Sequence, residues 1–124
     1  AGEQEAESAG LRAKRLPVGG AFHSPAMRPA VPGFCASLAQ AKIHKGSAPV
    51  FSCITCAPFD DVPYRLAQAL LSPVRWRETL LALQDAGAQR FLEPGPGTTL
   101  AGLVRRCLPE ADVVSPEELE PASA

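Results

Sequence analysis

Apolar positions recur with helical spacing between residue 27 and residue 41. Six of them lie three or four positions apart, which places them on one face of a helix. They are Met27, Ala30, Val31, Phe34, Leu38 and Ala41. Pro32 closely follows Pro29, and because proline removes a backbone donor within a helix, we expect a kink or a delayed helix start. We expect the apolar face to pack on a sheet.

A second helical pattern leads directly to a third. Either Asp60 or Asp61 can serve as the N-cap of a helix that runs through Leu71. Ser72 and Pro73 then fit the N-cap and the first position of the next helix, where the missing donor of proline costs nothing. We therefore expect the third helix to begin at Pro73.

The third helix has one apolar side and a clear stop signal. Trp76, Leu80 and Leu83 fall on the same face, so we interpret the tryptophan as part of the core. Gly87 should end the helix, because glycine readily adopts the left-handed conformation that often follows a last helical turn.

The last predicted helix follows a glycine-rich loop. Gly95-Pro96-Gly97 is expected to form a tight loop, and Thr98 or Thr99 can cap the helix that comes after it. The side expected to be buried consists of Leu100, Leu103, Val104 and Cys107. The loop matches neither GxGxxG nor GxxxxGK[ST], so we interpret it as a strand-to-helix turn and not as a phosphate-binding loop.

Short apolar runs between these helices predict strands. Residues 49–54 (PVFSCI) are typical of a buried strand in a parallel sheet. Shorter strands are expected at residues 14–18, 90–93 and 112–115. The alternation of strands and helices indicates an α/β fold.

The two ends of the chain carry weaker signals. Residues 3–9 favour a short helix that ends at Gly10. The tail from Pro116 is acidic and ends in alanine and serine, a composition typical of disordered segments.

The composition fits a globular protein and excludes some function classes. With 46% hydrophobic and 20% charged residues the chain can bury a core, and its net charge of -1 argues against nucleic-acid binding through a basic field. No apolar run approaches the ~20 residues that cross a bilayer. The acidic start AGEQEAES is unlike a signal peptide. We therefore expect a cytosolic protein without membrane association.

The four cysteines form no closely spaced framework. They are Cys35, Cys53, Cys56 and Cys107. In a cytosolic chain we expect them to be reduced. Cys53 and Cys56 make a CxxC, a spacing found in redox and metal sites, but no second pair or nearby histidine accompanies it. We therefore favour small buried residues at this position and predict no metal site.

His23 is the strongest candidate for chemistry. It lies in LPVGGAFHSPAM (residues 16–27), between an apolar run and a proline-started helix. The two glycines allow a sharp turn, and Ser24 with Pro25 can start the helix, so the imidazole can meet a cleft. From the residues alone, a structural histidine beside a phenylalanine remains the alternative.

Four stretches carry a family signature. They are AFHSP (residues 21–25), AKIHKGSAPVFS (41–52), SPVRW (72–76) and EPGPGTTLAGLVRR (93–106). In this order and spacing they resemble the C-terminal portion of the malonyl-CoA:acyl carrier protein transacylases. The resemblance implies the C-terminal part of the acyltransferase fold, a hydrolase-like, mostly parallel sheet with flanking helices, plus the end of a ferredoxin-like inserted subdomain.

The resemblance also implies how the chain divides. Residues 1–18 would end the inserted subdomain, residues 19–115 would form the C-terminal part of the core, and residues 116–124 would be a disordered tail. Family members are more than twice as long and carry their nucleophile in a Gly-His-Ser-x-Gly turn. No Gly-x-Ser-x-Gly occurs here. We therefore expect a C-terminal fragment that is inactive alone and that needs the N-terminal half of the same enzyme.

The resemblance assigns roles to three residues and implies an acidic carrier protein as partner. His23 matches the general base that activates the serine of the missing half. Ala69 stands where relatives usually have glutamine, and its backbone carbonyl would orient His23. Phe22 matches a bulky substrate-pocket residue that goes with malonyl rather than methylmalonyl groups. Arg105 and Arg106 are our candidates for binding an acidic carrier protein, with an ordinary solvated pair of cations as the alternative.

The implied function is transfer of a malonyl group from malonyl-CoA to the phosphopantetheine thiol of acyl carrier protein in fatty acid biosynthesis, without a metal or cofactor. Two alternatives remain: the acyltransferase domain of a polyketide synthase, and an inactive, non-enzymatic fragment. Cys53 stands where relatives usually have asparagine. We therefore do not expect the polar contacts of that asparagine in this chain.

Overall fold

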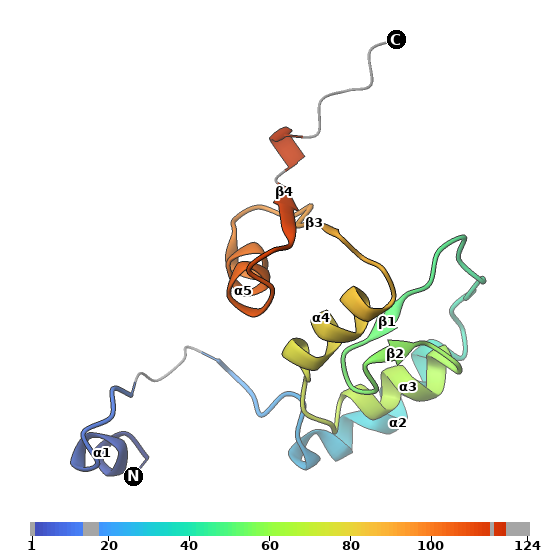
Figure 1. The fold of residues 1–124 in the computed structure, drawn as a ribbon. Helices are drawn as coiled ribbons and strands as arrows, with labels where there is room; N and C mark the ends of the chain where they lie inside the picture. The colour runs from blue at the N-terminus through green and yellow to red at the C-terminus, as the bar shows by residue number, and fades with distance from the viewer. Residues whose placement is uncertain (1, 14–17, 115, 119–124) are drawn as a thin grey trace.

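The computed structural model describes residues 2–13, 18–114 and 116–118. Helices and short strands follow one another along the chain, as Figure 1 shows. The elements are α1 (Gly2–Ser8), the 3-10 helix η1 (Pro25–Ala30), α2 (Val31–Leu38), β1 (Phe51–Ser52), β2 (Ala57–Pro58), α3 (Val62–Ala69), α4 (Trp76–Asp85), β3 (Arg90–Leu92), α5 (Thr99–Cys107), β4 (Asp112–Val114) and the 3-10 helix η2 (Pro116–Glu118).

The two ends of the chain are described in part. The strand expected over residues 14–18 lies outside the described residues except for Val18, which has no regular secondary structure. The first three residues of the acidic tail form η2, and residues 119–124 lie outside the description.

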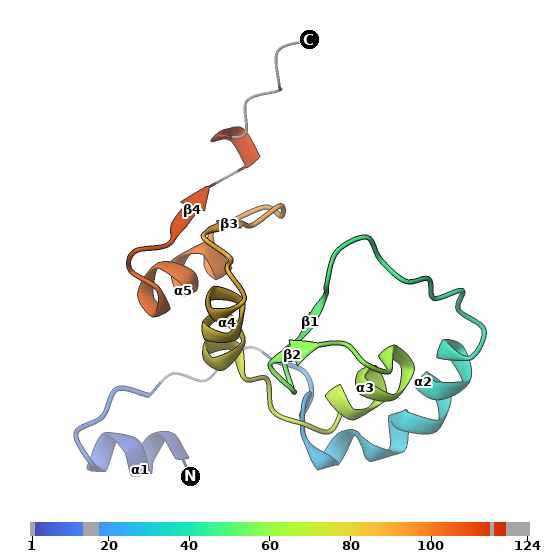
Figure 2. The same ribbon diagram turned by 45° about the vertical axis from the view of Figure 1, so that its right-hand side comes forward.

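α1 agrees with the helix expected over residues 3–9 and ends at the predicted glycine. Gly10 has a φ of 72°. Its N–H donates to the carbonyl of Glu7 at 3.0 Å, and the N–H of Leu11 donates to that of Ala6 at 2.9 Å. This pair of bonds is a Schellman cap. Figures 1 and 2 show α1 apart from the other helices.

α2 starts late, as its two prolines predict. The chain is a 3-10 helix through Ala30 and an α-helix from Val31, so Pro32 falls in the first turn, where its missing donor costs nothing. The predicted apolar face is half-buried at Met27, Val31, Phe34 and Leu38. It packs on α3 and η1, and Figure 2 shows the two α-helices side by side. Within the described residues the expectation that this face packs on a sheet is wrong, because the helix packs on α3 instead.

The strand expected over residues 49–54 is shorter and pairs differently. β1 pairs antiparallel with β2, with Ser52 opposite Ala57. Cys56 reverses the chain between them, with a φ of 56° and an N–H that donates to the carbonyl of Ser52 at 2.8 Å. The expectation of a parallel partner at this position is therefore wrong within the described residues, because a tight turn folds the chain back onto β1.

α4 begins later than predicted. Its N-cap residue is Arg75, whose N–H donates to the carbonyl of Cys53 at 2.8 Å. The hydroxyl of buried Thr79 donates to the carbonyl of Arg75 at 2.8 Å. The prediction that Ser72 and Pro73 start this helix is wrong, because the bond to the β1–β2 turn holds the chain out of a helical turn.

The end of α4 is where the sequence predicts it. Gly87 has a φ of 95°, and its N–H donates to the carbonyl of Gln84 at 2.9 Å. The N–H of Ala88 donates to the carbonyl of Leu83 at 3.0 Å, which completes a second Schellman cap.

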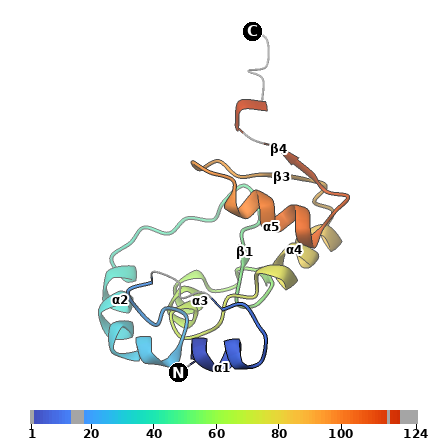
Figure 3. The same cartoon turned by 90° about the vertical axis from the view of Figure 1, so that its left-hand side faces the viewer.

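β3 and β4 form a parallel pair that α5 connects. Arg90 lies opposite Asp112, and the ladder continues to the ends of both strands. α5 contacts both strands and α4, an arrangement that Figure 3 shows from the side. The core between these elements contains Leu80, Val104 and Leu108, with Trp76, Phe91 and Val113 packed against them. The expectation of an α/β unit is confirmed here.

α5 differs from expectation in its cap and in one buried position. Thr98 is the N-cap residue but makes no side-chain hydrogen bond. Instead, the carboxylate of Glu93 accepts hydrogen bonds from the N–H groups of Leu100 at 3.2 Å and Ala101 at 2.8 Å. Leu100 is 45% exposed, and Ala101 takes its place in the core at 7%. The other predicted positions are buried or half-buried: Leu103, Val104 and Cys107.

Candidate functional site

His23 occupies a tight turn that leads into η1. Its backbone lies in the left-handed region with a φ of 58°, which costs a residue with a Cβ about 1–2 kcal/mol. Ser24 follows as the N-cap residue of η1, and its hydroxyl donates to the carbonyl of Ala21 at 2.6 Å. The turn leaves the side chain of His23 exposed. Strained residues of this kind gather at functional sites.

The imidazole of His23 is held by the end of α3. Its Nδ1 lies 2.7 Å from the carbonyl oxygen of Ala69, 46 positions later in the chain. Because a carbonyl oxygen only accepts hydrogen bonds, Nδ1 carries the proton in this contact, and Nε2 of the neutral ring keeps a lone pair. The fold therefore brings together two of the residues singled out from the sequence.

Helix geometry explains why the carbonyl of Ala69 is available. Asp61 caps the other end of α3, where its carboxylate accepts the N–H of Tyr64 at 3.0 Å, as the sequence predicts for one of the two aspartates. Ala69 is the last helical residue, and the last four carbonyls of a helix have no partner within it. His23 satisfies one of these carbonyls.

A polar network along α3 was not found from the sequence. Arg65 donates to both carboxylate oxygens of Asp60, from Nε at 2.8 Å and from Nη2 at 2.7 Å, and its Nη1 donates to Gln68 Oε1 at 2.8 Å. Gln68 Nε2 donates to the hydroxyl of Tyr64 at 2.9 Å. The Arg65 bonds, with the N–H of Asp61, hold the pKa of the Asp60 carboxyl well below its usual range.

The network separates the two polar groups at the end of α3. The Gln68 side chain is engaged with Arg65 and Tyr64, while the backbone carbonyl of the next residue faces His23. Spacings of three to five residues between partners are the signal that could have indicated the network.

Phe22, the predicted substrate-pocket residue, is 59% exposed beside His23. Its ring approaches the backbone of Gly20 closely. A Cβ at Gly20 would lie 3.3 Å from both Cε2 and Cζ of the ring. A side chain at residue 20 would therefore require the ring to move by a few tenths of an ångström.

Arg105 and Arg106 lie on the exposed last turn of α5. Arg105 donates from Nη2 to the carbonyl of Val113 at 3.2 Å, and Arg106 donates from Nε to the carbonyl of Gly102 at 3.3 Å. α5 contacts α4, β3 and β4, whereas η1, which begins two residues after His23, contacts α2. The structure therefore does not bring these two arginines next to His23.

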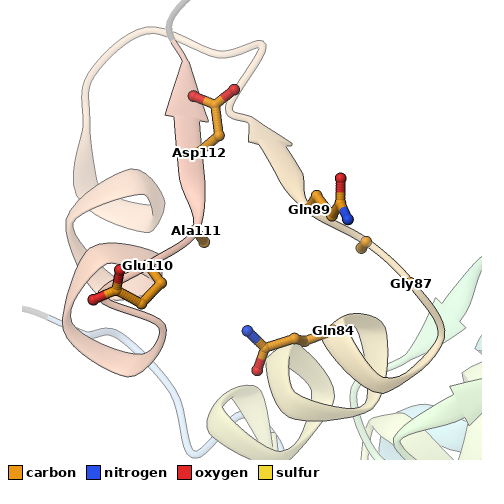
Figure 4. A pocket seen from close by; sticks show the side chains of 7 residues that line it. Gln84, Gly87, Gln89, Glu110, Ala111 and Asp112 are labelled. Atoms are coloured by element: carbon orange, nitrogen blue, oxygen red, sulfur yellow. The ribbon is translucent and has the colours of Figure 1, made fainter.

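A cleft of about 500 Å³ lies at the start of β4, between the ends of α4 and α5. Figure 4 shows Gln84, Gln89, Glu110 and Asp112 around it. Asp112 is already paired with Arg90. The cleft lies at the amino ends of the parallel strands, whereas ligands in α/β sheets bind outside the carboxyl ends. It includes none of the candidate site residues predicted from the sequence.

Residues 2–13, 18–114 and 116–118 contain neither a candidate metal site nor a candidate membrane-spanning helix. No group of three or more His, Cys, Asp or Glu side chains in these ranges could hold a metal ion. No helix in them has the length and apolar character that a bilayer crossing requires.

No family model matches the chain, but individual proteins do. The polyketide biosynthesis protein ThaF of Burkholderia thailandensis is 41% identical over 97 residues, which are 77% of this chain and 8% of that protein. The malonyl CoA-acyl carrier protein transacylase of a Synechocystis strain is 34% identical over 122 residues, which are 94% of this chain and 42% of the relative. The chain thus spans less than half the length of the curated relatives it matches.

Solved structures share the fold. The malonyl-CoA:acyl carrier protein transacylase of Xanthomonas oryzae superposes with a TM-score of 0.84 at 28% identity, over 90% of this chain and 37% of that one. A malonyl-transacylase solved in complex with its type II polyketide acyl carrier protein gives 0.82 at 27% identity, over 90% and 38%. These likenesses confirm the predicted acyltransferase fold. The chain belongs to the malonyl-CoA:acyl carrier protein transacylase family and corresponds to a C-terminal portion of its members.

Proposed function

We propose that this chain supplies the general base of an enzyme that transfers a malonyl group from malonyl-CoA to the phosphopantetheine thiol of an acyl carrier protein in fatty acid biosynthesis. The observation that carries the proposal is the hydrogen bond from Nδ1 of His23 to the carbonyl of Ala69. It fixes the orientation and tautomer of an exposed imidazole, as a proton shuttle requires. The Synechocystis relative bears the name of this activity.

In the proposed reaction His23 works with a serine from a segment outside these 124 residues. Nε2 takes the proton of the serine hydroxyl as its oxygen attacks the thioester carbonyl, and the imidazolium returns that proton to the departing thiol of coenzyme A. Nε2 then takes the proton of the carrier thiol, which attacks the acyl-serine, and returns it to the serine oxygen. The carbonyl of Ala69 stabilises the imidazolium in both halves. General base catalysis of this kind contributes about 10²–10⁴-fold.

Three further residues complete the proposal. Phe22 would lie beside the acyl group and favour malonyl over branched groups. Arg105 and Arg106 would attract an acidic carrier protein, because exposed cations near a docking surface steer an anionic partner. The chemistry needs no metal or cofactor beyond the phosphopantetheine of the carrier, and we place it in the cytosol.

The test joins this chain to the N-terminal portion of the Synechocystis relative and offers radiolabelled malonyl-CoA with acyl carrier protein. We expect the joined enzyme to transfer label to the carrier, and His23→Ala to lower the rate of this transfer at least about 100-fold. The 124-residue chain alone should acquire no covalent label. His44→Ala is the matched control, because His44 is an exposed histidine outside the site, and it should leave transfer unchanged. Equal transfer by the His23→Ala enzyme would contradict the proposal.

A polyketide carrier is the second candidate partner. The 41% identity to a polyketide biosynthesis protein favours it. The same joined enzyme is offered carriers from fatty acid and type II polyketide systems, and kcat/KM is compared. We expect the fatty acid carrier to give the higher value, and the reverse order would favour the polyketide alternative.

A further inference from the structure

The turn between β1 and β2 has a cysteine at each end. Ser52 and Ala57 are the last paired residues of the ladder, and Cys53 and Cys56 are the first and last residues of the four-residue turn between them. The first and last residues of a four-residue turn have Cα atoms less than about 7 Å apart. Disulfides span Cα distances of about 4.4–6.8 Å. The turn therefore brings the backbones of the two cysteines into the range that a disulfide can span.

A second observation brings the same two residues together. The carbonyl of Cys53 accepts the N–H of Arg75 at 2.8 Å, and Sγ of Cys56 lies 3.8 Å from the carbonyl oxygen of Arg75. Both cysteines therefore contact the backbone of one residue at the start of α4.

The backbone of Cys56 is a third sign that the position is unusual. Its φ of 56° lies in the left-handed region, where glycine is the ordinary choice and a side chain costs about 1–2 kcal/mol. His23 is the other residue of this kind among the described non-glycine positions. The cysteine is thus held in a strained turn at the place where a bridge to Cys53 would close the hairpin.

We propose that Cys53 and Cys56 form a reversible intramolecular disulfide when the chain meets a low-molecular-weight disulfide such as oxidised glutathione. The thiolate of one cysteine attacks a sulfur of the oxidant, forming a mixed disulfide and releasing one glutathione thiolate. The second cysteine attacks the protein sulfur of that mixed disulfide and releases the second glutathione. Two electrons pass from the cysteines to the oxidant, and the two thiol protons end on the released glutathione molecules.

The two redox forms differ in how the hairpin contacts α4. In the reduced chain Sγ of Cys56 lies 3.7 Å from Oγ1 of Thr79, a residue that is 2% exposed. A bond to Cys53 turns this sulfur toward the hairpin and removes the contact. The site would therefore respond to the thiol–disulfide balance. It is not proposed as a metal site, because two cysteines alone provide too few ligands.

The experiment uses the full chain with Cys35→Ser and Cys107→Ser, so that the CxxC pair alone remains. The chain is equilibrated in glutathione buffers of graded ratio, alkylated and analysed by mass spectrometry. We expect both thiols to disappear together, with a Cys53–Cys56 linked peptide. The glutathione ratio at half oxidation should shift at least about tenfold when urea unfolds the chain, about 30 mV for this two-electron couple.

The matched control moves one cysteine by a single position, with Thr55→Cys combined with Cys56→Ser. In this variant the glutathione ratio at half oxidation should be the same for the folded and the unfolded chain. Separate glutathione adducts on the two cysteines without a linked peptide, or a half-oxidation ratio that urea does not change, would overturn the proposal. If the serine background loses its circular dichroism signal, peptide mapping of the unaltered chain gives the same readout.

Discussion

The carboxylate of Glu93 caps α5 by accepting a hydrogen bond from the backbone N–H of Ala101 at 2.8 Å. Glu93 directly follows β3, whereas the hydroxyl at the N-cap position, that of Thr98, makes no such bond. A negative charge at a helix N-terminus also interacts favourably with the helix dipole. The contact joins the end of a core strand to the start of the connecting helix, so it should matter for stability.

Replacing Glu93 should therefore destabilise the fold. Glu93→Ala should lower the free energy of unfolding by about 1–2 kcal/mol, because both backbone hydrogen bonds and the charge are lost. Urea unfolding followed by circular dichroism measures the change. Thr98→Ala is the control and should stay within about 0.5 kcal/mol, since no hydrogen bond is removed. A greater loss for Thr98→Ala than for Glu93→Ala would contradict this assignment of the cap.

The ion pair of Asp60 and Arg65 predicts a pH dependence of stability. Because Arg65 holds the pKa of the Asp60 carboxyl below its usual value, the ionised form is favoured in the folded chain. This contribution is complete above the unfolded pKa of about 4 and is lost as the pH falls through the lower folded pKa. Asp60→Asn should therefore reduce stability at pH 7, and its difference from the unaltered chain should shrink at lower pH.

Urea midpoints at pH 7 and at acid pH measure this difference. Asp85→Asn is the control, because Asp85 is exposed and makes no ion pair within the described part of the chain. If the loss of stability caused by Asp60→Asn stays constant as the pH falls, the carboxylate charge is not its origin.

The contact of His23 with Ala69 predicts different effects for two changes at residue 69. Ala69→Gln keeps the backbone carbonyl and should leave malonyl transfer by the joined enzyme close to its starting value. Ala69→Pro should reduce transfer strongly, because proline disturbs the last turn of α3 at a cost of about 3 kcal/mol. Single-turnover transfer measures both, with circular dichroism to compare folding. Equal losses would mean that the side chain at this position matters and not the carbonyl.

Features set by neighbouring residues could be predicted from the sequence. The glycine caps at Gly10 and Gly87 and the aspartate cap of α3 depend on a few consecutive residues, and the structure has all three. The delayed start of α2 likewise follows from its own prolines.

Features set by distant partners could not be predicted. The start of α4 depends on a hydrogen bond to Cys53, and the cap of α5 comes from Glu93 in another element. At the candidate site, the family resemblance predicts the pairing of His23 with Ala69. No local pattern could predict it, because the two residues lie 46 positions apart in the chain. The strained backbone of His23 had no signal in the sequence, because the turn that imposes it is part of the tertiary structure.

Gly20 should control the selectivity of the proposed acyl site through the ring of Phe22. A Cβ at residue 20 would lie 3.3 Å from two ring atoms, so Gly20→Ala should displace the exposed ring by a few tenths of an ångström. We expect the methylmalonyl-to-malonyl ratio of kcat/KM in the joined enzyme to rise by up to about tenfold, and further with Phe22→Ala, since one methyl group is worth about 10–200-fold in a fitted pocket. Gly19→Ala is the matched control, because no atom lies within 4 Å of a Cβ there. If Phe22→Ala changes the ratio and Gly20→Ala does not, the ring accommodates the new side chain at residue 20 and Gly20 does not control selectivity. If neither variant changes the ratio, Phe22 does not line the acyl site.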